Sequence, residues 1–420
     1  MIKTEQYNMK NIVTDFFASI TVFLIALPLC LGIALASNTS LISGLLSGII
    51  GGIVVGILSG SHVSVSGPSA SIAAMVAIQI HTLGSFENFL AALVMAGIIQ
   101  ILMGLLKIGF IGSFFPNSVI KGLLFSVGII IILKQIPHLF GIDLDYEGDM
   151  SFFQPDNKNT FSELANILSN FHLGSLIVGI SCLLILYFFN KYKLEKIFKL
   201  PAALIAVLTC IFVSFLFSYL NTSLVIGTTH LVQVPLIESF SKINLFFTFP
   251  NFDISNPDLY LAAVSLALVT SLETLLNLEA VDKIDKSGRK SPANRELIAQ
   301  GIGNLFLGFI GGIPVTSAIL RSSVNVNSNA KSKLSTIFHG FLLLVLVCFL
   351  PNLLNQIPLS CLAGILIITG LKLADFNLFK QMYKQNTNQF LPFIITILAI
   401  LFSDLLIGII IGDRKSTRLN

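Results

Sequence analysis

The sequence predicts an all-α polytopic membrane protein, arranged as a seven-plus-seven inverted repeat with two broken half-helices and a truncated last span. Three observations predict this fold class: too few charged residues for a water-facing surface, basic residues concentrated in alternate loops, and a Pro/Gly pattern shared by the two halves. The first excludes a soluble protein, and the other two give the topology.

The composition places the chain in a lipid bilayer. Apolar residues make up 54% of the 420 positions and charged residues only 11%, against about 25% charged residues in a soluble domain. Apolar runs of about 20 residues have the length of membrane-crossing helices. The net charge of +4 comes from loop residues rather than a basic stripe, so no nucleic-acid partner is expected. We expect a protein integral to the cell (plasma or inner) membrane, without a cleavable signal peptide.

Thirteen apolar stretches are candidate spans, and a fourteenth begins near Asp404 and stops at Ile411. Two of them are short, rich in small and hydroxylated residues, and have a proline at or just before their start. These two, 66–80 and 316–326, are unlike lipid-facing helices. The thirteen stretches are 16–36, 41–60, 66–80, 87–107, 118–135, 173–190, 200–220, 257–280, 296–312, 316–326, 336–353, 359–373 and 389–403.

Loop charges predict the orientation. With a cytoplasmic N-terminus, the loops after the sixth, eighth, tenth and twelfth spans lie inside and are basic, which is the positive-inside pattern. Corresponding spans of the two halves are seven apart, an odd number, so the second half is inverted. The inside residues are Lys191, Lys193, Lys196, Lys199, Lys283, Lys286, Arg289, Lys290, Lys331, Lys333, Lys380 and Lys384, and one outside loop holds Asp143, Asp145, Glu147, Asp149 and Asp156 against Lys158.

The two halves also resemble each other in sequence. A Pro-x5-Gly-x-Leu pattern with a further glycine occurs twice, 242 positions apart, and the prolines of the two short stretches, Pro68 and Pro314, are 246 apart. Inverted repeats with Gly/Pro-broken segments at corresponding positions indicate a transporter's binding site. The first pattern contains Pro116, Gly122 and Gly128, and the second contains Pro358, Gly364 and Gly370.

The repeat predicts the domain organisation. We expect first-repeat core helices and the start of the gate in 1–135, the remaining first-repeat gate helices and outside loops in 136–256, and second-repeat core helices in 257–353. Truncated second-repeat gate helices follow in 354–412, and 413–420 is a polar tail.

The two short segments are the candidate anion site. A helix that begins inside the membrane exposes free N–H groups and the positive end of its dipole, which favour an anion. Glycine lets a ligand approach, and hydroxyl groups add donors. The alternative is that small residues only permit tight helix packing. The candidate substrate-binding residues are Ser66, Ser69, Ala70, Thr316, Ser317, Ala318, Ile319, Leu320 and Arg321.

Glu273 is the candidate for cation or proton coupling, because an ionisable residue within a span is costly unless it has a function. Asn277 lies one turn further on, on the same helix face. The alternative is a structural carboxylate that is hydrogen-bonded between helices. Arg321 can add positive charge near the anion or pair with a carboxylate. A lone Glu with few oxygen neighbours is a poor Na⁺ site, which favours a proton.

The sequence contains no pattern of an enzyme or of a metal site. The five cysteines lie in or beside apolar runs without metal-ligand spacing, which is typical of buried packing residues. The six histidines are scattered near span ends. HExxH, P-loop, GxSxG and GxGxxG-plus-strand patterns are absent. We therefore expect no catalytic residues, no metal ligands and no cofactor other than Na⁺ or H⁺ as coupling ion.

Two stretches of the sequence stand out: 294–304 reads Asn-Arg-Glu-Leu-Ile-Ala-Gln-Gly-Ile-Gly-Asn, and 311–321 reads Gly-Gly-Ile-Pro-Val-Thr-Ser-Ala-Ile-Leu-Arg. Both resemble the SulP (sulfate permease) transporters of inorganic anions. Asp15 and the segment 25–30 are a looser match. This resemblance implies fourteen segments in two inverted repeats, with a core domain that moves against a gate domain. It implies an anion between the two broken-helix N-termini, near Ser69 and Ala70 and near 318–320, and a coupling role for Glu273.

Two departures from the family pattern accompany the resemblance. Leu29 stands where family members often carry Gln after Pro28, and no cytoplasmic STAS domain follows residue 412. The polar tail is consistent with a truncation or a scar.

The predicted function is secondary active transport of small inorganic anions of the sulfate/bicarbonate class by alternating access. We expect this transport to be a symport that is coupled to a cation or a proton. The alternatives are a nucleobase-type transporter of similar architecture, which usually has a second carboxylate in the tenth span, and an anion channel. The expected partners are a small inorganic anion, the lipid bilayer and, as an open alternative, a second copy in a homodimer.

Overall fold

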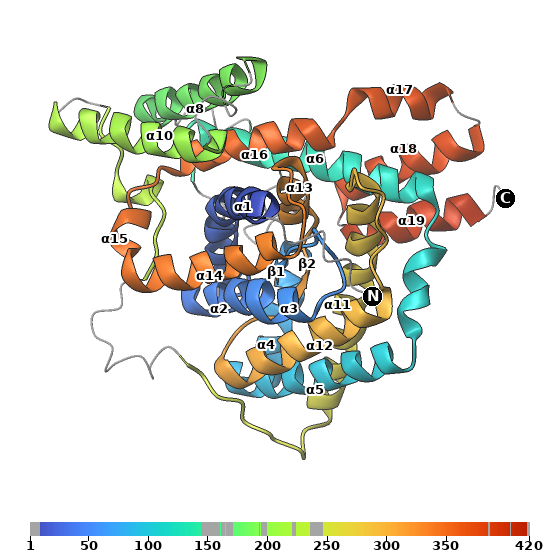
Figure 1. The fold of residues 1–420 in the computed structure, drawn as a ribbon. Helices are drawn as coiled ribbons and strands as arrows, with labels where there is room; N and C mark the ends of the chain where they lie inside the picture. Colours follow the sequence, from blue (N-terminus) through green and yellow to red (C-terminus); the bar gives the residue numbers. More distant parts are fainter. Residues whose placement is uncertain are drawn as a thin grey trace. The chain divides into compact units, whose positions relative to one another are not determined.

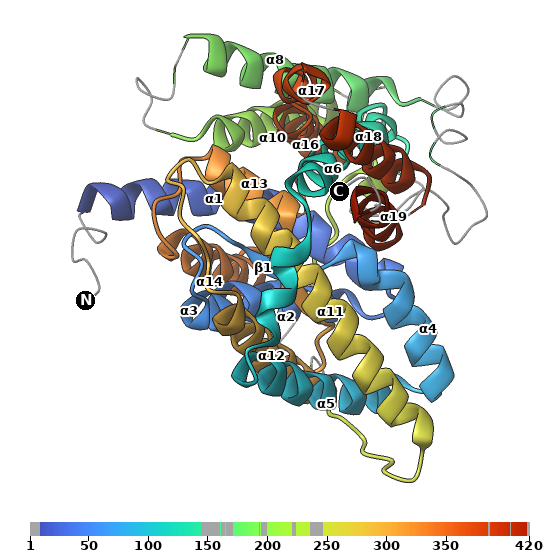
Figure 2. The same ribbon diagram turned by 90° about the vertical axis from the view of Figure 1, so that its right-hand side faces the viewer.

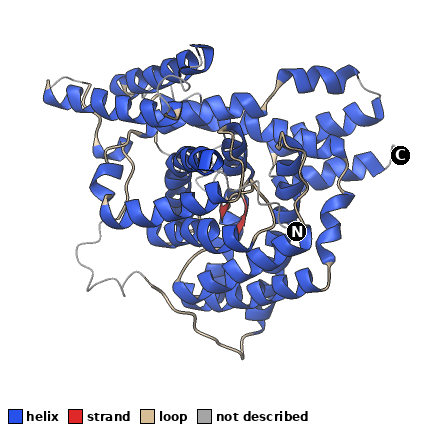
Figure 3. Cartoon of the chain, in the orientation of Figure 1, coloured by secondary structure: helices blue, strands red, loops and turns tan. Residues whose placement is uncertain are grey.

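The computed structural model describes residues 9–143, 160, 164, 171–192, 194, 200–220, 224–235, 247–384, 387–403 and 405–417. The described residues are mostly helical, with two short strands among the helices (Figure 3). Some of the loop residues used to predict the orientation lie outside the described residues: Asp145, Glu147, Asp149, Asp156, Lys158, Lys193, Lys196 and Lys199.

Among the described residues, eight helices are long and apolar enough to cross a membrane. Three shorter apolar helices cover Ala70–Leu83, Leu334–Phe349 and Asn388–Phe402. These helices lie where the sequence predicted spans. The N-terminal orientation stays a prediction.

The chain divides into two compact units, and each is described by itself (Figure 1). Unit 1 contains Met1–Phe114, Tyr146–Gly148 and Val234–Pro351, and unit 2 contains Phe115–Asp145, Asp149–Gln233 and Asn352–Asn420. Each unit therefore takes segments from both halves of the sequence. The repeat boundaries stay a prediction.

Unit 1 is built around two short strands that are enclosed by helices (Figure 2). Helix α1 packs on α2 and α14, α5 packs on α11 and α12, α2 borders β1 and α11 borders β2. Its elements are α1 (Met9–Ala36), α2 (Leu41–Ile50), η2 (Gly51–Val55), α3 (Gly56–Leu58), β1 (Ser66–Pro68), η3 (Ala70–Ile72), α4 (Ala73–Leu83), α5 (Phe86–Leu105), η4 (Ile108–Phe114), α11 (Pro257–Ile284), α12 (Ala293–Ile310), β2 (Val315–Ser317), α13 (Ile319–Asn327) and α14 (Leu334–Phe349).

The described part of unit 2 consists of helices and loops, and its β-type pairing is an isolated bridge between Leu231 and Pro358. Helix α16 packs on α6 and α8, and α18 packs on α6 and α19. Its elements are α6 (Asn117–Leu139), α8 (Leu173–Tyr192), α10 (Ala202–Tyr219), η5 (Thr228–His230), α16 (Leu359–Leu373), α17 (Phe376–Lys384), α18 (Thr387–Phe402) and α19 (Leu405–Thr417), and α15 (Pro351–Leu354) lies at the boundary between the units.

Repeat-related glycines meet inside unit 2. A Cβ on Gly128 of α6 would lie 2.7 Å from the carbonyl oxygen of Gly370 on α16, and a Cβ on Gly370 would lie 2.8 Å from the carbonyl oxygen of Gly128. The two backbones are too close for any larger residue. The packing beside this crossing is apolar and includes Phe125, Met382 and Phe393.

The structure differs from the predicted spans at three places. The two short segments begin as strands, so that their helices start at Ala70 and Ile319 rather than at 66 and 316. In the first segment this is because Pro68 has no N–H group and the residue before a proline is pushed toward extended backbone. Residues 376–384, which the sequence predicted to be a loop, form α17. Helix α19 continues past Ile411 to Thr417, because Arg and Lys favour helix as much as apolar residues do.

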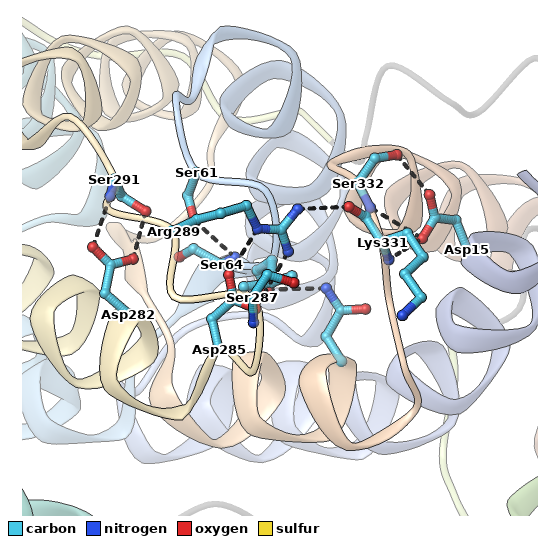
Figure 4. A network of polar contacts seen from close by, with 12 residues as sticks. Asp15, Ser61, Ser64, Asp282, Asp285, Ser287, Arg289, Ser291, Lys331 and Ser332 are labelled. Carbon is cyan, nitrogen blue, oxygen red and sulfur yellow. Dashed lines mark hydrogen bonds and ion pairs between the residues drawn. The ribbon is translucent and has the colours of Figure 1, made fainter. Parts of the chain in front are cut away.

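A polar network fixes the loops at one end of unit 1 (Figure 4). Asp15 of α1 accepts hydrogen bonds from the backbone nitrogens of Lys331 (2.6 Å) and Ser332 (3.2 Å). Arg289 pairs with Asp285 at 2.8 Å and donates to the Lys331 carbonyl oxygen at 2.7 Å. Burial alone would raise the pKa of Asp285, but the hydrogen bonds from Arg289 and Ser287 hold it below its usual value. The network ties α1 and the α11–α12 connection to the loop before α14.

Candidate functional site

The two segments predicted to hold the anion lie side by side in unit 1. Strands β1 and β2 are antiparallel, with Ser66 opposite Ser317, Gly67 opposite Thr316 and Pro68 opposite Val315. The N–H group of Ala318 donates to the carbonyl oxygen of Val65 at 2.9 Å. Because Ser69 and Ala318 are extended residues directly before helical turns, both helices begin beside this strand pair.

These first turns supply backbone donors. The first N–H groups of a helix have no partner within the helix and carry the positive end of its dipole. Ala70 starts the turn after β1, and Ile319 and Leu320 start α13. Ala70, Ile319 and Leu320 have apolar side chains, so only their N–H groups can serve an anion. The structure thus places both predicted broken-helix starts next to one strand pair.

Arg321 lies in the first turn of α13 and is 1% exposed. Its Nη2 is 3.5 Å from the carbonyl oxygen of Pro68 and 3.5 Å from Cys30 Sγ. A Cβ on Gly67 would lie 1.7 Å from Nη1, so glycine at this position makes room for the guanidinium group. No ion pair between described residues includes Arg321. Of its two predicted roles, positive charge near the strand pair therefore fits better than pairing with a carboxylate.

Glu273 of α11 contacts the start of the turn after β1. Its Oε1 accepts hydrogen bonds from the hydroxyl groups of Ser69 and, at 2.5 Å, of Ser71. Glu273 is 4% exposed. The carboxylate thus links α11 to the first of the two broken segments.

One turn further along α11, polar side chains hold β2. Asn277 Nδ2 donates to the carbonyl oxygen of Ser317 at 2.6 Å, and the Ser317 N–H group donates to Thr274 Oγ1 at 3.4 Å. The hydroxyl groups of Ser317 and Ser64 are 2.7 Å apart. Asn277 therefore positions the strand, and its amide is already occupied in doing so.

Three polar atoms of the candidate residues have no hydrogen-bond partner within the described part of the chain: Glu273 Oε2, Thr316 Oγ1 and Arg321 Nη1. Leaving a buried polar group unpaired costs about 1–3 kcal/mol. Buried polar groups without a partner are rare and need an explanation such as a ligand. Thr316 Oγ1 and Arg321 Nη1 can donate hydrogen bonds, which suits an anion. Glu273 Oε2 is an acceptor, which suits a cation.

Each of the other predicted hydroxyl groups has a hydrogen-bond partner. Ser66 Oγ accepts a hydrogen bond from Gln300 Nε2 at 2.6 Å, and Ser69 donates to Glu273. The Ser317 hydroxyl pairs with that of Ser64. Thr316 Oγ1 makes no hydrogen bond to a described residue by distance, but it lies close enough to the Glu273 carboxylate to interact with it.

Several site residues were missed by the sequence reasoning. Ser71 completes the contacts of Glu273, and His339 of α14 lies within electrostatic range of Arg321, with both ring nitrogens unpartnered in the described part of the chain. The short Ser69-x-Ser71 spacing after Pro68 could have indicated a paired hydroxyl site. No local signal marked His339, because its neighbour comes from a different helix.

A second buried carboxylate lies next to the strand pair. Glu296 of α12 is 1% exposed and accepts hydrogen bonds from the Ser59 hydroxyl and, at 3.0 Å, from Gln300 Nε2. On the next turn, Asn304 Oδ1 accepts from the Val315 N–H group at 2.7 Å. From the sequence, Glu296 is an ordinary acidic residue in the first turn of a helix. The fold turns it into part of the support under β1 and β2.

The sequence matches the profile of the Sulfate permease family over residues 12–396. Among its relatives is a putative sulfate transporter, YvdB of Bacillus subtilis, which is 31% identical over 97% of this chain and 73% of the relative. The bicarbonate transporter BicA of Picosynechococcus is 28% identical over 97% of this chain and 70% of the relative.

Solved structures share the fold. The transmembrane domain of a cyanobacterium bicarbonate transporter BicA superposes with a TM-score of 0.64 at 21% identity, over 97% of this chain and 98% of that one. The structure of SLC26A9 superposes with a TM-score of 0.66 at 20% identity, over 99% of this chain and 66% of that one. The predicted fold class, an all-α membrane protein with an inverted repeat, is confirmed.

Proposed function

The chain belongs to the sulfate permease family, and on that premise we propose that it moves a small inorganic anion of the sulfate/bicarbonate class across the membrane by coupled, alternating-access transport. It is a transporter and not an enzyme. The anion would bind at the first turns that follow β1 and β2. The residues that would hold it are the N–H groups of these turns, the Thr316 hydroxyl group and the Arg321 guanidinium group.

The observation that carries this proposal is the pairing of β1 with β2. It brings two helix starts, one from each half of the chain, to the same place. Helix N-termini bind anions through N–H groups and the helix dipole. Arg321, with an unpartnered Nη1, and Thr316 both lie on the second of these two segments. A nucleobase-type site would need a carboxylate on the segment that here carries Arg321.

Glu273 is the proposed coupling residue. Its Oε1 is held by two serine hydroxyl groups, and its Oε2 has no partner in the described part of the chain. The sequence-based preference for a proton assumed few oxygen neighbours around Glu273. Two hydroxyl oxygens beside the carboxylate remove that reason, because Na⁺, like other hard cations, favours oxygen ligands. We therefore propose a monovalent cation, Na⁺ or H⁺, and leave the choice to the gradients tested below.

The test is anion uptake into proteoliposomes with a panel of sulfate, bicarbonate, chloride and dicarboxylate. Each anion is offered with a Na⁺ gradient, with a pH gradient and with neither. Saturable uptake that a single cation gradient drives is the expected result. Flux that does not saturate and ignores both gradients would favour a channel and contradict the proposal.

Two variants test the residues. Glu273→Gln keeps the shape and removes the charge, so it should eliminate the gradient dependence while anion exchange survives. Ser317→Leu should abolish uptake while membrane insertion stays intact, because it places a bulky group beside the helix start. Full gradient dependence in Glu273→Gln, or unchanged uptake kinetics in Ser317→Leu, would count against the proposed site. Chemical crosslinking of the same liposomes tests whether a second copy joins the chain in a homodimer.

A further inference from the structure

Three of the five cysteines meet inside unit 2, against the expectation that they are unrelated packing residues. Cys182 of α8, Cys210 of α10 and Cys361 of α16 are all free thiols and all 0% exposed. Their sulfur atoms lie within 4.8 Å of one another. Because the three come from separate helices, the sequence shows no ligand spacing.

Close helix packing brings these thiols together. A Cβ on Gly364 of α16 would lie 3.1 Å from Cys182 Sγ and 3.4 Å from the carbonyl oxygen of Gly179 on α8. Gly364 is the second-repeat counterpart of Gly122. Glycine at this position lets α16 approach α8 until the Cys182 Sγ–H group reaches the carbonyl oxygen of Cys361 at 3.2 Å.

The thiols make weak hydrogen bonds to helix backbone. Besides the bond from Cys182, Cys210 Sγ donates to the carbonyl oxygen of Val178 at 3.7 Å. Thiols are weak donors and weak acceptors. Loss of these contacts on metal binding would cost little, and the lone pairs of all three sulfur atoms stay available.

We propose that Cys182, Cys210 and Cys361 form a binding site for one thiophilic divalent cation, of the zinc and cadmium class. Metal–sulfur bonds of about 2.3 Å require sulfur–sulfur separations of about 3.8–4.0 Å in tetrahedral or trigonal geometry. The observed limit of 4.8 Å is close enough that small rotamer shifts suffice. No histidine or carboxylate joins the group among the described residues, and an all-sulfur ligand set selects soft cations over Mg²⁺ or Ca²⁺.

Binding exchanges the thiol protons for the ion. All three thiols lose their protons to water, because a cysteine ligates a metal ion as the thiolate. The two positive charges of the ion offset two of the three thiolate charges, so the complex keeps a single negative charge. No electron transfer is involved.

The consequence of binding is a link between helices. Helices α8 and α10 come from the first half of the sequence and α16 from the second. An ion at this site would join all three and stabilise unit 2 by mass action, because the unfolded chain does not hold the three thiols together. This inference is independent of the anion site, which lies in unit 1.

The test uses the purified full chain in detergent with reduced thiols, titrated with Cd²⁺ alone. We expect one Cd²⁺ per chain by elemental analysis, a thiolate-to-metal charge-transfer absorption in the ultraviolet, and a higher unfolding temperature. Loss of an outer-shell partner of a metal ligand costs about 10–100-fold in affinity, so Cys361→Ser should weaken binding by at least about 10-fold. The triple Cys182/Cys210/Cys361→Ser variant should lose the absorption.

The control is Cys348→Ser in unit 1, which removes a partly exposed cysteine of α14 and should leave Cd²⁺ binding unchanged. If the serine variants fail to fold, X-ray absorption at the cadmium edge of the Cd²⁺-loaded wild-type protein decides the question. Three sulfur neighbours around the cadmium would support the site. Only oxygen or nitrogen neighbours, no ion bound by the reduced wild-type chain, or an unchanged signal in the triple variant would overturn it.

Discussion

In each unit of this molecule, repeat-related segments from the two sequence halves meet, but the two crossings differ in kind. In unit 1, β1 meets β2 as extended backbone, and the surrounding side chains are polar. In unit 2, α6 meets α16 as two helices in contact at Gly128 and Gly370, beside apolar packing. The same repeat relation thus gives a polar crossing in one unit and an apolar crossing in the other.

The difference follows from where the backbone hydrogen bonds go. A helix satisfies its N–H and C=O groups internally, so two helices can meet through bare glycines. An extended segment at membrane depth is tolerated only where protein or a cavity supplies partners. In unit 1 those partners include Asn277, which donates to the Ser317 carbonyl oxygen, and Asn304, which bonds both the N–H group and the carbonyl oxygen of Val315. The polar crossing is therefore the place for a ligand, and the apolar crossing serves packing.

The largest expected effect is that of Gly67→Ala in the polar crossing. The new Cβ would lie 1.7 Å from Arg321 Nη1 and would displace the guanidinium group. Displacements of about 1 Å in a functional site can cost about 100-fold in activity, so anion uptake should fall at least about that far. Uptake by proteoliposomes measures it. The control is Gly227→Ala, whose Cβ meets nothing closer than 3.8 Å; equal losses in both variants would refute this role of Gly67.

Gly128→Ala in the apolar crossing should instead lower stability. Its Cβ would lie 2.5 Å from the backbone nitrogen of Ala374. Overpacking costs about 1–3 kcal/mol, which exceeds the gain of about 1 kcal/mol for replacing Gly by Ala within a helix. We expect a lower unfolding temperature and less folded protein, with an unchanged anion KM in what folds. A raised KM with normal stability would break the comparison.

Thr316→Val tests the unpartnered hydroxyl group. A neutral hydrogen bond is worth about 0.5–1.5 kcal/mol, so the KM for the anion should rise by about 2- to 12-fold. The unfolding temperature should not fall, because Thr316 Oγ1 has no partner among the described residues. The matched control is Thr396→Val in unit 2, where Oγ1 donates to the Pro392 carbonyl oxygen at 2.7 Å. That variant should lose some stability at unchanged KM, and a reversed pattern would contradict the assignment.

The smallest effect concerns a fully partnered carboxylate in unit 2. Asp143 accepts hydrogen bonds from His138 and His230, both at 2.6 Å, one at each oxygen. Burial alone would raise the pKa of Asp143, but these two hydrogen bonds hold it below its usual value of 3.8. The hydrogen bond from Asp143 raises the pKa of His230 above its usual 6.5, and burial opposes this in part.

The sign follows from these directions. The raised pKa of His230 stabilises the folded state fully below pH 6.5 and less as the pH rises through the folded-state pKa. The lowered pKa of Asp143 stabilises it above pH 3.8 and less as the pH falls through its folded-state value. When the pH rises from about 6 to about 9, the free energy of unfolding should fall further in the wild-type protein than in His230→Gln. The expected difference between the two falls is below about 1 kcal/mol. Identical pH profiles of the unfolding temperature in wild-type protein and His230→Gln would contradict this stabilising role of His230.

The sequence by itself determined the features that depend on local pattern. Composition and run length identify a membrane protein, the Pro/Gly pattern reveals the repeat, and Glu273 stands out because a carboxylate within a span is costly. The two broken segments were recognised by their small residues and prolines. Each of these signals lies within one segment of the chain or in a comparison of two segments.

Only the tertiary structure decided which groups meet. Strand pairing places Ser66 opposite Ser317, and helix packing joins Cys182, Cys210 and Cys361. Which hydroxyl stays free, and whether Arg321 meets a carboxylate, also depends on residues far away in the sequence. The physical reason is range: hydropathy and helix propensity act over a few residues, whereas a hydrogen-bond partner or a metal ligand set is defined by contacts that form only when distant segments pack.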